Sequence, residues 1–113
     1  MKGASDIEKL GQVAQLMLDH RLGQLRTAAD ELERSRMQLA ALNQGARGDD
    51  LEPVTAERVA LRYERWADHR RAELNLVIAR QTAGWLEARS EAQTAFGRAQ
   101  ALKGLAKRLQ QRR

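Results

Sequence analysis

The sequence predicts an all-α protein: a long antiparallel two-helix coiled-coil hairpin with an overhanging C-terminal helix. The composition is dominated by Ala, Leu, Glu, Gln and Arg, which are strong helix formers. Only 4% of the residues are aromatic, so a seam between two helices is easier to fill than a thick core. Apolar residues recur at spacings of three and four along two long segments. One stretch, NQGARGDDLEP, separates these segments with two glycines and a proline, which end helices.

The first helix is expected over residues 6 to 43, approximately. Ser5 and Glu8 fit a capping box at its start. Its seam should contain one charged intruder, Arg36, among Leu18, Leu22, Leu25, Ala29, Leu32 and Leu39. Upstream, the same rhythm continues in another phase through Ile7, Leu10, Ala14 and Met17. The change of phase predicts a stutter near residues 17 and 18.

The second helix is expected over residues 55 to 111, approximately, after a turn at 44–54. Thr55 is a suitable N-cap residue. The early part of this helix shows no clear seam. From Leu74 onward the seam is regular, and it comprises Leu74, Ile78, Gln81, Trp85, Ala88, Ala92, Ala95, Ala99, Leu102, Ala106 and Leu109. Residues 1–113 should therefore form a single helical hairpin.

The two helices differ in predicted length, about 57 Å against about 87 Å at 1.5 Å per residue. Folding the chain at residue 48, in the middle of the break, places Ile7 beside Glu91. Residues after position 91 then have no partner within the chain. The apolar stripe from Ala92 to Leu109 should need another helix or another protein to cover it.

The C-terminal end is the candidate binding site, because it carries both basic side chains and a stripe of apolar residues. Residues 1–57 carry seven Lys or Arg and ten Asp or Glu, whereas residues 58–113 carry thirteen and five. The candidate partner-binding residues are Ala95, Arg98, Ala99, Leu102, Lys103, Ala106, Lys107, Arg108, Leu109, Arg112 and Arg113. The cations can complement the helix macrodipole, attract a protein partner, or contact nucleic acid or lipid. Nucleic acid is disfavoured because Phe96 is the only aromatic residue that accompanies these cations.

No combination of residues indicates catalysis, a cofactor or a metal. The two histidines, His20 and His69, fall at different levels of the expected hairpin, and the acidic turn lacks the spacing of a calcium loop. Cysteine is absent, which excludes thiolate sites. We therefore expect a protein that is not an enzyme. The sequence contains no apolar run long enough for a secretory or transmembrane segment, so we expect a cytoplasmic protein.

The hairpin pattern, the short Gly/Asp break and the closing residues ALKGLAKRLQQRR resemble the FliJ/YscO-type stalk proteins of bacterial flagellar and type III export machines. The resemblance covers the whole chain as a pattern. It implies a non-enzymatic stalk or adaptor whose paired ends engage a hexameric export ATPase ring. It also implies contacts with the export gate and with chaperones, at the periphery of a membrane-bound apparatus. It carries over no individual site residue, and it leaves flagellar and virulence-type systems equally open.

Two other functions remain open at this point. The chain can be a structural coiled-coil protein that homodimerises through its C-terminal overhang, which self-association would support. It can also be a basic helical hairpin that binds nucleic acid, which a steep salt dependence of binding would support.

Overall fold

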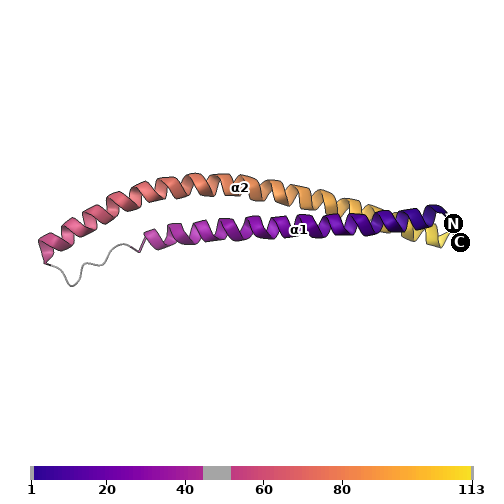
Figure 1. Ribbon diagram of the computed structural model, residues 1–113, viewed down its shortest axis with the longest axis horizontal. Coiled ribbons are helices and arrows are strands. Elements are labelled where there is room, and N and C mark those ends of the chain that lie inside the picture. Colours follow the sequence, from indigo (N-terminus) through magenta and orange to yellow (C-terminus); the bar gives the residue numbers. More distant parts are fainter. Residues whose placement is uncertain (1, 45–51, 113) are drawn as a thin grey trace. The chain divides into compact units, whose positions relative to one another are not determined.

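The computed structural model describes residues 2–44 and 52–112 and contains two long helices (Figure 1). Helix α1 comprises Lys2–Leu42 and helix α2 comprises Pro53–Gln111. Within the described ranges no residue lies in a β-strand. The predicted all-α helical hairpin is thus confirmed. Most of the expected turn, residues 45–51, lies outside the described residues.

Both helices begin earlier than the capping signals suggested. Helix α1 already includes Ser5, so this residue does not cap its start. Helix α2 begins at Pro53 rather than after Thr55. The carbonyl of Glu52 accepts the first helical hydrogen bond, from the amide of Ala56 at 2.7 Å. Proline suits the first position of a helix because the amide hydrogen that it lacks would have no partner within the helix.

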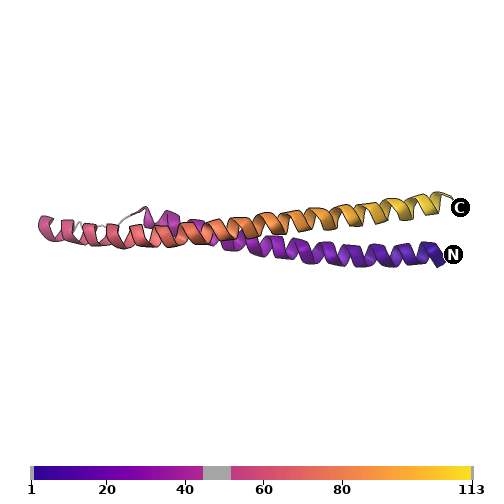
Figure 2. The ribbon, with the colours of Figure 1, turned by 90° about the horizontal axis from the view of Figure 1, so that it is seen from above.

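The chain divides into two compact units, and each unit contains part of both helices. Unit 1 comprises Met1–Ala29 and Gly84–Arg113, and unit 2 comprises Asp30–Ala83. In unit 1 the first turns of α1 and the last turns of α2 lie at the same end, as both views show (Figures 1 and 2). The two helices of unit 1 therefore run antiparallel.

The core of unit 1 is made of small and medium apolar side chains. Ala14 and Leu18 from α1 are buried against Ala95 and Ala99 from α2, and Leu102 packs against this cluster. Beyond the cluster, the guanidinium of Arg21 donates a hydrogen bond of 2.7 Å to the Glu91 carboxylate. Because Ala95 and Ala99 have short side chains, Leu18 can pack directly against α2.

The core of unit 2 lies at the C-terminal end of α1. Leu42 is buried with Ala67 and Leu74, and Leu39 and Tyr63 pack against these residues. The hydroxyl of Tyr63 donates a hydrogen bond of 3.1 Å to the carbonyl of Leu42. This carbonyl belongs to the last turn of α1, whose acceptors have no partner within the helix. Helix α2 thus caps the end of helix α1.

Arg71 of α2 adds a charged group to the same cap. Its Nη2 lies 3.5 Å from the Leu42 carbonyl, and its Nε donates a 3.3 Å hydrogen bond to Oδ1 of Asn43. Asp68 and Glu64 hold the other side of this guanidinium, at 2.7 and 3.6 Å. A cation at a helix C-terminus is favourable because the macrodipole is negative there.

The expected overhang of the C-terminal helix is wrong. Ala95, Ala99 and Leu102 are covered by α1, so the stripe after residue 91 has its partner within the chain. Glu91 lies beside Arg21, not beside Ile7. In unit 2 it is the start of α2 that extends beyond the end of α1, as both views show (Figures 1 and 2). The midpoint of the turn does not set the register; the apolar contacts within each unit do.

The seam of α1 keeps an unbroken spacing of three and four, so the expected stutter is also wrong. Its successive positions, each buried or half-buried, are Ala4, Ile7, Gly11, Ala14, Leu18, Arg21, Leu25, Ala28, Leu32, Ser35, Leu39 and Leu42; Gln15, Gly23 and Ala29 beside them are also half-buried. Leu22 and Arg36, which were expected in the seam, are exposed. Ser35 is only 7% exposed, and its hydroxyl donates to the carbonyl of Glu31 at 3.3 Å. The polar intruders are therefore Arg21 and Ser35, not Arg36.

The seam of α2 agrees with the sequence prediction. All eleven positions from Leu74 to Leu109 are buried or half-buried. The segment before Leu74 shows no regular seam in the sequence, and part of it is the stretch that extends beyond α1.

Candidate protein-docking surface

The structure describes ten of the eleven candidate residues, and these fall into two groups. Ala95 and Ala99 are buried in unit 1, and Leu102, Ala106 and Leu109 are half-buried on the same seam. Ala95, Ala99 and Leu102 belong to the core of unit 1 or pack against it, so the predicted stripe is not bare. The exposed group consists of cations, namely Arg98, Lys103, Lys107, Arg108 and Arg112. Arg113 lies outside the described residues.

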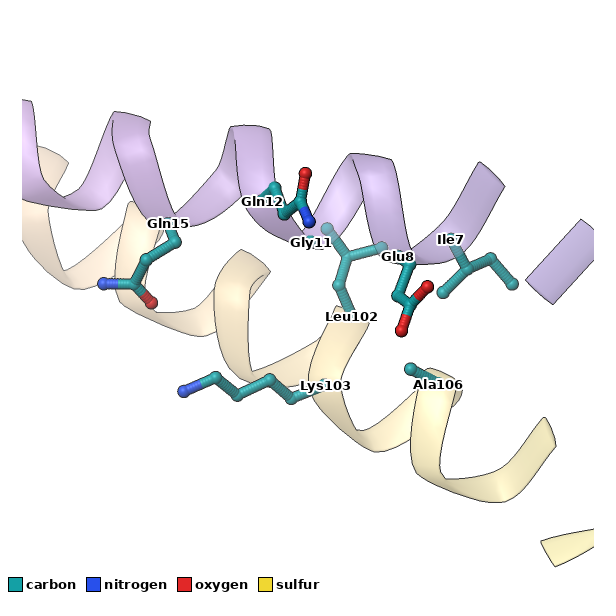
Figure 3. A pocket seen from close by; sticks show the side chains of 8 residues that line it. All are labelled: Ile7, Glu8, Gly11, Gln12, Gln15, Leu102, Lys103 and Ala106. Atoms are coloured by element: carbon teal, nitrogen blue, oxygen red, sulfur yellow. The ribbon is translucent and has the colours of Figure 1, made fainter. Parts of the chain in front are cut away.

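One groove runs along one side of the seam in unit 1, and its exposed surface is mostly apolar although four of its lining side chains are charged or amide groups (Figure 3). Its lining residues are Ile7, Glu8, Gly11, Gln12 and Gln15 from α1, and Leu102, Lys103 and Ala106 from α2. In the view of Figure 3, the Glu8 carboxylate and the Lys103 amine lie on opposite sides of Leu102. The groove therefore offers an acid, a base and two amides around an apolar floor.

A second groove in unit 1, here called the apolar groove, shares only Leu102 with the first. It is lined by Leu10, Val13, Ala14 and Met17 from α1 and by Arg98, Ala101 and Leu102 from α2. Leu10, Val13 and Met17 are 55%, 52% and 47% exposed, although all three are large and apolar. Their spacing of three and four places them on one side of α1, beside the seam. Leu105, one turn after Ala101 on α2, is also exposed.

Sequence reasoning missed the apolar groove because it placed Leu10 and Met17 in the seam. The first half of α1 carries two neighbouring apolar stripes, one through Ile7 and Ala14 and the other through Leu10, Val13 and Met17. An antiparallel partner covers only one of them. The recognisable signal was the change of phase, which indicates a second apolar stripe rather than a stutter.

The positive charge of the chain is concentrated in the unit that carries both grooves. Unit 1 contains eleven Lys or Arg and five Asp or Glu, a net charge of +6. Unit 2 contains nine and ten, a net charge of −1. The two values add to the +5 of the whole chain. Unit 1 is therefore the part that an acidic partner would approach.

The two histidines lie in different units. His20 belongs to unit 1, and His69 belongs to unit 2, where its Nε2 lies 2.8 Å from the Glu73 carboxylate. Among the described residues, no group of three or more His, Cys, Asp or Glu side chains could hold a metal ion. Neither helix, over the residues that the structure describes, has a stretch long and apolar enough to cross a membrane.

Comparisons with protein-family models, with curated proteins and with solved structures find no match for this chain. A functional proposal therefore depends on the grooves, the charge of unit 1 and the resemblance in sequence pattern.

Proposed function

We propose that the chain is a non-enzymatic coiled-coil adaptor, a stalk of the FliJ/YscO type that engages an export ATPase in bacterial flagellar or type III protein secretion. The paired ends of α1 and α2, in unit 1, make this contact. The adaptor acts in the cytoplasm, at the periphery of a membrane-bound export apparatus. The resemblance adds the export gate and chaperones as further protein partners.

The observation that carries the proposal is the combination of exposed apolar side chains and net positive charge in unit 1. Leu10, Val13 and Met17 remain about half-exposed although the hairpin has already buried its seam. Apolar side chains gathered on a surface beside charged ones are typical of a contact with another protein. The resemblance implies that the paired ends face the ATPase ring, and these side chains lie on those paired ends.

The exposed cations have a separate role in the proposed contact. Lys103, Arg108 and Arg112 are exposed on α2 in unit 1. Charges at the rim of an interface mainly raise the association rate and make it depend on salt, because they steer the encounter without being desolvated. They direct unit 1, rather than unit 2, toward an acidic surface.

The test is binding to the purified export ATPase of the same organism, followed by biolayer interferometry at several salt concentrations. Substituting Lys103, Arg108 and Arg112 by Gln should lower the association rate and flatten its salt dependence. The matched control substitutes Arg58, Arg62 and Arg65 by Gln, which removes three exposed cations from unit 2 instead. Absence of binding by the unaltered chain, or an equal effect of both triple substitutions, would contradict the proposal.

A further inference from the structure

We infer that the apolar groove is the docking site for one amphipathic helix of the partner protein, and that the flank of this helix is acidic. Such a helix would add a third member to the two helices of unit 1. The inference deepens the proposed function and rests on it, because it specifies the chemistry of the surface that the partner presents to the adaptor.

The spacing of the apolar side chains in the groove fits a helix. Leu10, Val13 and Met17 provide apolar positions over two turns of α1, and Ala101 faces them from α2. A docked helix anchors itself with residues three, four and seven positions apart, which match this length. Alanine at position 101 leaves room for a larger anchoring side chain from the partner. The three α1 side chains are each about half-exposed, so a docked helix still has apolar area to cover.

The charge beside the groove selects an acidic flank. Arg98 lines the groove, and among the described residues no carboxylate lies within ion-pair distance of its guanidinium. A carboxylate on the docked helix would supply that partner. The net charge of +6 on unit 1 acts in the same direction over a longer range.

The same charges argue against a second copy of this chain in the groove. A symmetric dimer through this face would bring two units of charge +6 together and would place both Arg98 side chains in one interface. Like charges that face each other across an interface oppose association. The apolar stripe after residue 91, which was expected to supply a dimer contact, is covered by α1.

The probe is a synthetic amphipathic peptide with leucine along one helical face and glutamate elsewhere, labelled for fluorescence anisotropy and titrated with the full chain. A second peptide has the same composition in an order that abolishes the apolar face. A third replaces each glutamate by lysine. We expect only the first peptide to bind.

Variants of the chain then locate the binding site. Leu10→Gln or Val13→Gln should weaken binding of the first peptide about tenfold, because each removes apolar surface that the peptide would cover. The matched control is Leu16→Gln, which alters a side chain of α1 that is 69% exposed and does not line the groove. It should change the affinity less than about twofold. Arg98→Gln should weaken binding more than Lys107→Gln, although both remove one charge from unit 1.

Several results would overturn the inference. They are equal binding of the first two peptides, equal effects of Leu10→Gln and Leu16→Gln, or a homodimer in sedimentation velocity that Leu10→Gln abolishes. Circular dichroism must show unchanged helicity in each variant. If Leu10→Gln loses helicity, Val13→Thr tests the same contact with a smaller change.

Two outcomes distinguish a failure of the inference from a failure of the proposed function. If the export ATPase binds the unaltered chain and the Leu10→Gln variant equally well, the inference is wrong and the proposed function stands. If the first peptide occupies the groove but the ATPase does not bind, the ATPase is the wrong partner.

Discussion

Replacing three glycines of unit 1 by alanine should stabilise the protein. Gly23, Gly84 and Gly97 all lie inside helices. A Cβ atom added at any of them would meet no atom of the surrounding structure within 4 Å. Glycine inside a helix costs about 0.5–1 kcal/mol relative to alanine, because its unfolded chain has more conformational freedom to lose. Since the added methyl groups have open space around them, no steric penalty should offset this gain.

The magnitude follows from adding three independent sites. Effects at separate positions without shared contacts are nearly additive, so the triple variant should gain about 1.5–3 kcal/mol in the free energy of unfolding. For a chain of this length, that gain corresponds to an increase in Tm of roughly 5–15 °C. Guanidinium titration followed by circular dichroism at 222 nm measures the free energy directly.

The reverse substitution provides the control. Ala79→Gly changes an exposed position of α2 and should lose about 0.5–1 kcal/mol. The reasoning fails if any of the three glycine substitutions lowers the stability, because the added methyl group would then have met an atom that the structure places elsewhere.

Three further experiments test the register and the contacts between the helices. Ser35→Gln should lower the free energy of unfolding by about 1–3 kcal/mol, because the larger side chain overfills a buried position. In the same denaturant titration, Arg36→Gln should change it by less than about 0.5 kcal/mol. A larger loss for Arg36→Gln than for Ser35→Gln would place Arg36 in the seam. Tyr63→Phe should cost about 1 kcal/mol by removing the hydrogen bond to the end of α1, and no loss would mean that water replaces it fully. A double-mutant cycle of Arg21→Ala and Glu91→Ala should give a coupling of at most about 1 kcal/mol that 1 M salt removes, because both side chains are more than a third exposed. A larger coupling that persists in salt would contradict that reasoning.

The seam of α2 was predictable from the sequence, whereas half of the seam of α1 was not. In α2, apolar residues, mostly alanine and leucine, occupy one face, with Gln81 as the one polar member. In α1, Leu22 is adjacent to Arg21, and a shift of one residue rotates a side chain by about 100° around the helix. Hydrophobicity alone favours Leu22 over Arg21 as the seam residue. The structure instead places Arg21 at the seam, where its aliphatic stem can pack while its guanidinium reaches Glu91.

The register required a comparison of the two seams rather than a measurement from the turn. The regular seam of α2 runs from Leu74 to Leu109 and matches the length of the seam in α1. Choosing the midpoint of the turn assumed that the connection is symmetric, and the C-terminal overhang followed from that assumption. The exposed cations of unit 1 could be identified from their positions between seam residues. The second apolar stripe of α1 was recognisable from the change of phase, but the residues of α2 that complete the apolar groove were not, because their place beside this stripe depends on the register.

The contacts between the two helices close loops of different length, and loop length affects the order in which the contacts form during folding. The hydrogen bond from Tyr63 to Leu42 joins residues 21 positions apart, whereas the one from Arg21 to Glu91 joins residues 70 positions apart. Closing the longer loop directly costs about 1 kcal/mol more entropy. Pairing should therefore start in unit 2 and reach unit 1 last, and unit 1 should be the first to open. Any partner that bound unit 1 would hold the last-formed pairing closed, and its binding energy would stabilise the folded chain.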